Sequence, residues 1–107
     1  MVIKLIANPT AGRGGKDTIQ QVQAYLRLRG AKVNLFETGK RGDALKAAME
    51  ARNEDIDIVV GAGGDGTINE IINGLAGSDI PLGVIPLGTV NVFALETGIP
   101  MDPARAC

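Results

Sequence analysis

Histidine is absent from this sequence, which also holds a single cysteine and a single serine, Ser78. Without histidine, no imidazole can act as a base, a nucleophile or a ligand, and no Ser–His arrangement can form. One cysteine excludes an intramolecular disulfide framework and a metal site built from cysteines. Any chemistry in this chain must therefore proceed without a histidine or a pair of thiols.

An excess of charge and long apolar segments are missing as well. The chain has 11 basic and 12 acidic residues, a net charge of −1, which excludes a polybasic binder of nucleic acid or of anionic membranes. Its apolar runs are far shorter than the ~18 residues of a membrane span, and the first ten residues do not resemble a signal peptide. With 107 residues, 45% of them hydrophobic, we expect one small domain in a reducing, cytoplasmic setting.

Glycine is abundant, with 15 residues, about twice the usual share. The glycines fall between short apolar runs and segments of helical periodicity. The pattern predicts a strand at 2–7, a loop at 8–15 and a helix at 16–29 that ends at a left-handed Gly30. The later elements are a strand at 32–36, a turn at 38–42, a helix at 44–52 with Asp43 as its N-cap, a strand at 56–60, a loop at 61–66, a helix at 67–75, a strand at 82–85, a turn at 86–89 and a short helix at 90–96.

Strand, loop and helix in repeated order predict an α/β fold, a Rossmann-like three-layer α/β/α domain with a mostly parallel sheet. Ligands of such sheets bind beyond the carboxyl ends of the strands. Because all four loops follow strands, we expect them to converge on one edge of the sheet.

The loop Gly63-Gly64-Asp65-Gly66-Thr67 is the most informative segment. Glycines let the backbone approach a bulky anion, and the N–H groups of the following helix would point at it. Thr67 could cap the helix or bind a phosphate oxygen. Asp65 fits a magnesium ligand or an acceptor of the proton from an attacking hydroxyl. The alternative is a tight turn in which Asp65 is only a cap.

The other loops give weaker signals. The segment 8–15 matches neither common phosphate-binding fingerprint, and its nearest cations, Arg13 and Lys16, could equally be solvated surface charges. Thr38 and Thr89 end the second and fourth strands, and Asn91 follows. Each could be a simple turn residue, so their value lies in sharing one edge with Asp65.

Four motifs in order resemble the catalytic domain of the diacylglycerol kinase family. They are Asn8 to Gly12, Thr38 before Gly42-Asp43-Ala44, Gly63 to Glu70, and Pro86 to Asn91. The resemblance implies ATP, Mg²⁺ and phosphoryl transfer to the hydroxyl of a lipid, with Asp65 as the catalytic residue and no further metal ligand assigned. It implies ATP binding by Asn8, Pro9, Thr10, Ala11, Gly12, Thr38, Gly63, Gly64, Asp65, Gly66, Thr67, Ile68, Asn69 and Thr89.

Two departures from the family pattern matter. Val92 stands where the family often has aspartate. The family also has a second, β-rich domain that helps to form the lipid site, and this chain ends about where that domain should begin. We therefore expect the nucleotide-binding half of a lipid kinase, inactive alone, with transient membrane contact at most, no nucleic-acid partner, and an exposed apolar surface that favours self-association.

Three other functions remain open. An NAD kinase shares the Gly-Gly-Asp-Gly-Thr loop, although Asn69-Glu70 and the segment 86–91 favour the lipid kinase. A non-catalytic nucleotide-binding module is compatible with the short chain, but gains little from Asp65 among phosphates. A dinucleotide-binding dehydrogenase is the weakest alternative because its fingerprint is missing.

Overall fold

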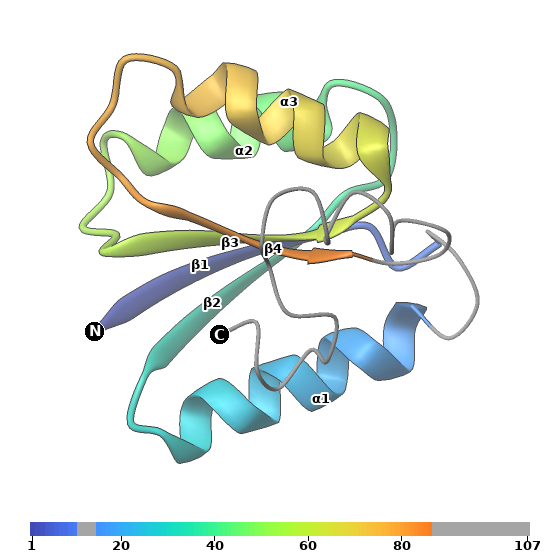
Figure 1. Cartoon of the computed structure of the whole chain (residues 1–107), viewed down its shortest axis with the longest axis vertical. Helices are drawn as coiled ribbons and strands as arrows, with labels where there is room; N and C mark the ends of the chain where they lie inside the picture. Colours follow the sequence, from blue (N-terminus) through green and yellow to red (C-terminus); the bar gives the residue numbers. More distant parts are fainter. Residues whose placement is uncertain (11–14, 87–107) are drawn as a thin grey trace.

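A parallel β-sheet forms the centre of the domain (Figure 1). The structure, a computed structural model, describes residues 1–10 and 15–86, so the expected helix at 90–96 lies outside the described residues. The elements are β1 (Val2–Ala7), α1 (Gly15–Leu28), β2 (Lys32–Glu37), α2 (Asp43–Ala51), β3 (Ile58–Gly63), α3 (Asp65–Leu75) and β4 (Leu82–Pro86).

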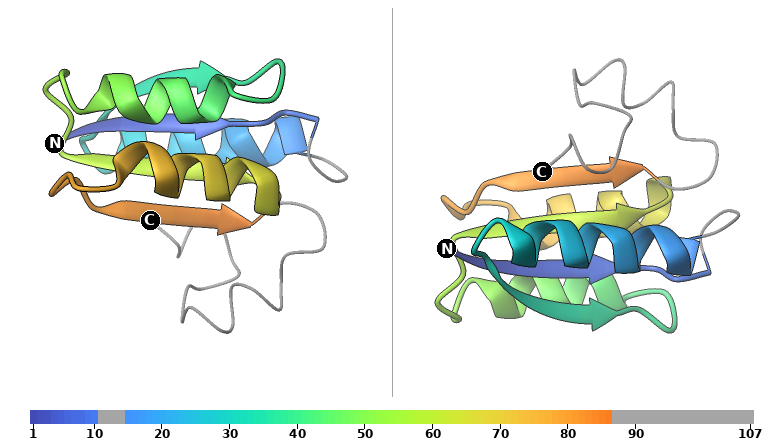
Figure 2. Two further views of the ribbon diagram at one scale, coloured as in Figure 1. Left: turned by 90° about the horizontal axis from the view of Figure 1, so that it is seen from above. Right: turned by 90° about the horizontal axis from the view of Figure 1, so that it is seen from below.

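The strands lie in the order β2-β1-β3-β4, and every pair is parallel. Ile3 on β1 pairs with Val33 on β2 and with Ile58 on β3. Gly63, the last residue of β3, pairs with Pro86 at the end of β4. The carboxyl ends of all four strands therefore lie along one edge, as the two views of Figure 2 show, which is the arrangement that a βα repeat predicts.

Helices cover both faces of this sheet: α1 lies on one face, and α2 and α3 lie side by side on the other (Figure 1). The alternation of side chains along β1 supplies both cores. Leu5 packs with Ile19 and Val22 of α1, whereas Ile6 packs with Ala47 of α2 and Ile71 of α3. The expected three-layer α/β/α domain is confirmed.

Lys4 is the one charged residue buried among the described residues, with 6% of its surface exposed. Its Nζ donates to the Ala47 carbonyl at 2.9 Å and to Glu54 Oε1 at 2.8 Å. The aliphatic stem thus lies within the α2 side of the sheet while the ammonium group is paired. The bond to the Ala47 carbonyl joins β1 to α2. The apolar pattern of the strand did not predict this contact.

The corner between β3 and α3 is shorter than the sequence predicted. The strand runs to Gly63 instead of Val60, and the helix begins at Asp65 instead of Thr67. Gly61 pairs with Ile6 of β1 and Val84 of β4, and a Cβ there would lie 2.7 Å from Ile71 Cδ1. What looked like a glycine loop is therefore mostly the end of a central strand on which α3 packs closely.

Two other expectations about helices can be compared with the structure. Gly30 has a φ of +88° and follows α1, so the left-handed end is confirmed. The spacing of Ile68, Ile71, Ile72 and Leu75 predicts that all four lie on one side of the helix. Ile68, Ile71 and Leu75 are buried as expected, but the prediction is wrong for Ile72, because 48% of its surface is exposed.

Candidate nucleotide site

Three βα loops meet at the carboxyl edge of the sheet and line a hollow of about 360 Å³. The loops are anchored on neighbouring strand ends: the N–H of Asn8 donates to the Ala62 carbonyl at 2.9 Å, and that of Thr38 donates to the Ala7 carbonyl at 2.8 Å. The predicted convergence is therefore confirmed for the first three loops. The hollow is lined by Asn8, Thr10, Thr38, Gly39, Lys40, Arg41, Ala44, Gly66, Thr67 and Glu70.

The loop after β1 begins with a turn that is closed by its own side chain. Asn8 Oδ1 accepts hydrogen bonds from the N–H of Thr10 at 3.0 Å and from its hydroxyl at 2.7 Å. This side-chain turn sets both polar residues on the wall of the hollow. Pro9 between them is half-buried, and Ala11, Gly12 and Arg13 lie outside the described residues.

The loop between β2 and α2 is held by two carboxylates. Asp43 Oδ2 accepts from the N–H of Gly39 at 2.8 Å and from that of Lys40 at 3.0 Å. The predicted N-cap role of Asp43 is wrong, because Gly42 is the N-cap and Asp43 already lies in the first turn of α2. Its carboxylate faces backwards onto the loop instead of onto its helix.

Glu70 of α3 is the second of these carboxylates. Its Oε1 accepts from the N–H of Gly42 at 3.1 Å and from that of Leu45 at 3.2 Å. Gly42 has a φ of +94° and no side chain that could cap the helix. A residue 28 positions away in the sequence therefore satisfies two donors at the start of α2.

The corner between β3 and α3 has a different character. Its N-cap, Gly64, makes no side-chain hydrogen bond, and the helix's own ladder begins with the N–H of Ile68, which donates to the Gly64 carbonyl at 3.1 Å. Within the described residues, no side chain caps the N–H groups of Asp65, Gly66 or Thr67. Neither Asp65 nor Thr67 caps the helix, although the sequence left both possibilities open, and these donors face the edge of the sheet.

The glycines of this corner serve two purposes. A Cβ on Gly63 would lie 2.8 Å from Thr67 Cβ, so the tight step from strand to helix requires glycine there. Gly64 and Gly66 have no atom of the described residues within 4 Å of such a Cβ, and neither has a positive φ. Packing and backbone geometry therefore leave these two glycines unexplained.

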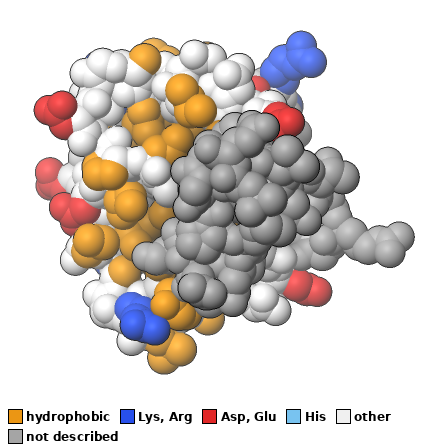
Figure 3. Space-filling model, in the orientation of Figure 1, with side chains coloured by type: hydrophobic (Ala, Val, Ile, Leu, Met, Phe, Trp, Pro, Cys, Tyr) orange, Lys and Arg blue, Asp and Glu red, His pale blue; other side chains and the backbone are white. Residues whose placement is uncertain are grey.

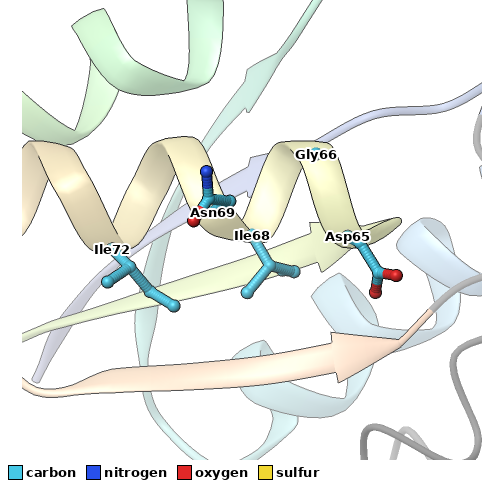
Figure 4. A pocket seen from close by; sticks show the side chains of 5 residues that line it. All are labelled: Asp65, Gly66, Ile68, Asn69 and Ile72. Atoms are coloured by element: carbon cyan, nitrogen blue, oxygen red, sulfur yellow. The ribbon is translucent and has the colours of Figure 1, made fainter.

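Asp65 and Gly66 also border a second hollow, of about 440 Å³, on the side of α3 that faces β4 and points away from α2 (Figure 4). Ile68 and Ile72 point into it from successive turns, while Asp65 lies at the end of the helix with its carboxylate exposed. The start of α3 thus separates a polar hollow from an apolar one. Hydrophobic side chains gather on this face of the molecule, from α3 across the sheet edge (Figure 3).

Most of the predicted residues that the structure describes line one of the two hollows, whereas Pro9, Gly63 and Gly64 line neither. Asn8, Thr10, Thr38, Gly66 and Thr67 line the polar hollow, while Asp65, Ile68 and Asn69 line the apolar one. Lys16 is exposed near the start of α1 and lines neither. The sequence did not indicate Lys40, Arg41 or Glu70 as wall residues. Thr89, Asn91 and Val92 lie outside the described residues.

Acidic side chains that could bind a metal by themselves are not clustered here. Across residues 1–10 and 15–86, no group of three or more His, Cys, Asp or Glu side chains could hold an ion. Lys40 and Arg41 are exposed on the wall of the polar hollow, where they would attract an anion. No helix of the described part of the chain is long and apolar enough to cross a membrane.

Comparison with known proteins defines the class to which this domain belongs. The family model of the diacylglycerol kinase catalytic domain matches residues 2–107. A crystal structure of a diacylglycerol kinase from Bacillus anthracis superimposes with a TM-score of 0.81 at 35% identity, covering 97% of this chain and 37% of that one. The chain therefore belongs to the diacylglycerol kinase catalytic domain family.

Individual relatives carry the same name. The chain is 45% identical to a diacylglycerol kinase of Bacillus subtilis over 102 residues, which cover 92% of this chain and 34% of the relative. It is 40% identical to that of Staphylococcus haemolyticus, with 92% and 31% covered. The chain thus spans about a third of the length of these relatives. A phosphate-loop protein of known solution structure, 22% identical with a TM-score of 0.56, supports the fold alone.

Proposed function

We propose that this chain is the ATP-binding part of a lipid kinase, which transfers the γ-phosphate of ATP to the hydroxyl of a lipid such as diacylglycerol. Family membership supports a kinase of this class. The observation that carries the proposal is the start of α3, at the meeting point of three loops. Among the described residues, no side chain caps its first N–H groups and no atom lies within 4 Å of a Cβ placed on Gly64 or Gly66.

The phosphates of ATP would bind at the start of α3. The N–H groups of Asp65, Gly66 and Thr67 are available there, and the positive end of the helix dipole attracts an anion. The bare Gly64 and Gly66 allow a phosphate to approach the backbone, which accounts for glycines that the fold itself does not require. The remaining proposed ATP contacts are Asn8, Pro9, Thr10, Ala11, Gly12, Thr38, Gly63, Ile68, Asn69 and Thr89.

Asp65 is the proposed catalytic residue. Its carboxylate is exposed in the first turn of α3 and borders the apolar hollow, next to Gly66, which lines both hollows. Magnesium in kinases is held by one or two carboxylates together with the substrate phosphates, so a single aspartate fits that ion and would supply part of its coordination. Mg²⁺ would neutralise charge on the transferred phosphoryl group. Asp65 could alternatively accept the proton of the attacking hydroxyl.

The lipid would approach from the other side of α3. The hollow that Asp65 borders there is lined by the apolar side chains of Ile68 and Ile72, which suit an acyl chain better than a second nucleotide. This placement favours a lipid acceptor over NAD. We assign residues 1–107 to the ATP-binding domain and assign completion of the lipid site to the further length that the relatives have. On this account the 107-residue chain binds ATP and does not complete turnover.

Calorimetry with ATP and Mg²⁺ tests the proposal on the 107-residue chain. We expect saturable binding by the wild type and by Asp65→Asn, because the backbone donors remain. In a version with the length of the relatives, Asp65→Asn should abolish most transfer of labelled phosphate to diacylglycerol. Absence of ATP binding by the wild-type chain would overturn the proposal, and labelling of NAD instead of lipid would replace it with the NAD kinase.

A further inference from the structure

Glu70 links the two helices on one face of the sheet at the wall of the candidate site. Its carboxylate is part-buried and binds the N–H groups of Gly42 and Leu45. The start of α2 therefore depends on a side chain from α3.

The neighbouring turn of α3 makes this link rigid. Gly74 lies one turn beyond Glu70 on the same side of the helix, and a Cβ there would lie 2.6 Å from Ala48 Cβ and 2.7 Å from the Leu45 carbonyl oxygen. The backbones of α2 and α3 therefore touch at this point. With both turns engaged, the loop of Thr38 to Arg41 has a fixed position relative to Gly66.

We propose that Glu70 is a positioning residue for the nucleotide. It holds the wall formed by Thr38, Lys40 and Arg41 at a set distance from the start of α3. It also accepts from the N–H groups of Gly42 and Leu45 at the start of α2, whereas among the described residues no side chain caps the start of α3. The inference rests on the proposed function, since it presumes that the hollow binds ATP.

Hydrogen exchange in the wild-type chain without ligand tests the link directly. Leu45 and Thr67 occupy the same position of the first turn in α2 and α3. We expect the Leu45 and Gly42 amides to exchange at least tenfold more slowly than the Thr67 amide, because only the former have a carboxylate acceptor. Equal exchange of Leu45 and Thr67 would overturn the inference and leave the proposed function standing.

Substitution tests the consequence for ATP. Glu70→Ala removes the acceptor, Glu70→Gln keeps an oxygen that can accept both bonds, and Glu50→Ala removes an exposed carboxylate of α2 as a control. We expect ATP affinity to fall about tenfold, which is about 1.4 kcal/mol, in Glu70→Ala and to stay within about twofold in the other two.

Three outcomes separate the hypotheses. Wild-type binding with equal affinity in Glu70→Ala would refute positioning by Glu70. Equal losses in the alanine and glutamine variants would refute the hydrogen-bonding mechanism. No binding by the wild type would refute the proposed function instead. If Glu70→Ala does not fold, Glu70→Asp, whose shorter side chain cannot reach both donors, takes its place.

Discussion

The helices α2 and α3 both follow a glycine N-cap along the same edge of this domain, but their first N–H groups differ in their hydrogen-bond partners. At α2, Gly42 is left-handed and the first N–H groups are bound by carboxylates, from Glu70 for the helix and from Asp43 for the loop before it. At α3, Gly64 is extended and, among the described residues, no side chain caps the helix. The start of α2 is closed, because carboxylates of the protein already bind its N–H groups. The start of α3 is open, because its N–H groups can still bind the anion of a ligand.

This difference indicates where phosphate belongs. A helix start that already faces two carboxylates repels a triphosphate and has few donors left. The start of α3 has donors, a helix dipole and two glycines, and no atom of the described residues lies within 4 Å of a Cβ placed on either glycine. The sequence singled out the glycines before α3, but the carboxylates that bind the N–H groups at the start of α2 appear only in the structure.

The largest expected effect comes from separating the two helices. Gly74→Ala places a Cβ 2.6 Å from Ala48 Cβ and 2.7 Å from a backbone oxygen, so α2 and α3 must move apart. Overpacking of this kind costs about 1–3 kcal/mol, and we expect the upper end of this range because the contact involves backbone. Urea denaturation would measure the change, and an unchanged midpoint would contradict the close contact of the helices.

Gly66→Ala should have the opposite effect on stability and a clear effect on binding. Alanine is favoured over glycine inside a helix by about 1 kcal/mol, and a Cβ at this position meets no described atom. The unfolding midpoint should therefore rise, while affinity for ATP falls several-fold because the Cβ occupies the approach of the phosphate.

Asn73→Ala is the matched control for that glycine. The substitution raises the helix propensity at an exposed position of α3 that lines neither hollow. Stability should therefore rise, and ATP affinity should stay unchanged. If Gly66→Ala binds ATP as tightly as this control does, the open space above Gly66 is not a phosphate path.

Asp43→Ala tests the closed start with a smaller change. The substitution removes the acceptor for the N–H groups of Gly39 and Lys40, which costs about 1–2 kcal/mol. Because that loop forms one wall of the hollow, ATP affinity should also fall. The midpoint of urea denaturation and calorimetry with ATP would give the two numbers, and no change in either would contradict the loop geometry.

The smallest expected effect concerns the exposed cations Lys40 and Arg41. Changing both to glutamine should weaken ATP binding about two- to fivefold at low ionic strength, because exposed charges act through solvent. The difference from the wild type should shrink as salt is raised to ~0.5 M. A loss that does not depend on salt would mean that these side chains bind the nucleotide by direct, desolvated contacts.

Much of the fold could be predicted from the sequence, because apolar runs and helical periodicity are local signals. The strands at 2–7 and 32–36 and the long first helix were placed within one residue of their observed bounds. The start of α3 was misplaced because Gly61 and Gly63 look like loop residues. Their burial depends on Ile71 and Thr67 packing on them, which is tertiary information.

The candidate site could also be predicted only in part from the sequence. The convergence of the loops follows from a parallel βα repeat, so Asn8, Thr38 and Gly66 could be placed on one edge before their contacts were known. The bonds from Glu70 to Gly42 and Leu45 could not, since they join residues 25 and 28 positions apart. A glutamate facing a neighbouring helix carries no sequence signal that separates it from a solvated one.

The most direct test of the central claim is an amide nuclear magnetic resonance titration of the 107-residue chain with ATP and Mg²⁺. We predict that the signals of Asp65, Gly66 and Thr67 shift most and become protected from exchange, while Gly42 and Leu45 change little. Large shifts at Gly42 and Leu45 without shifts at the start of α3 would contradict the account. Phosphate would then bind at the start of α2, where carboxylates already accept from the N–H groups.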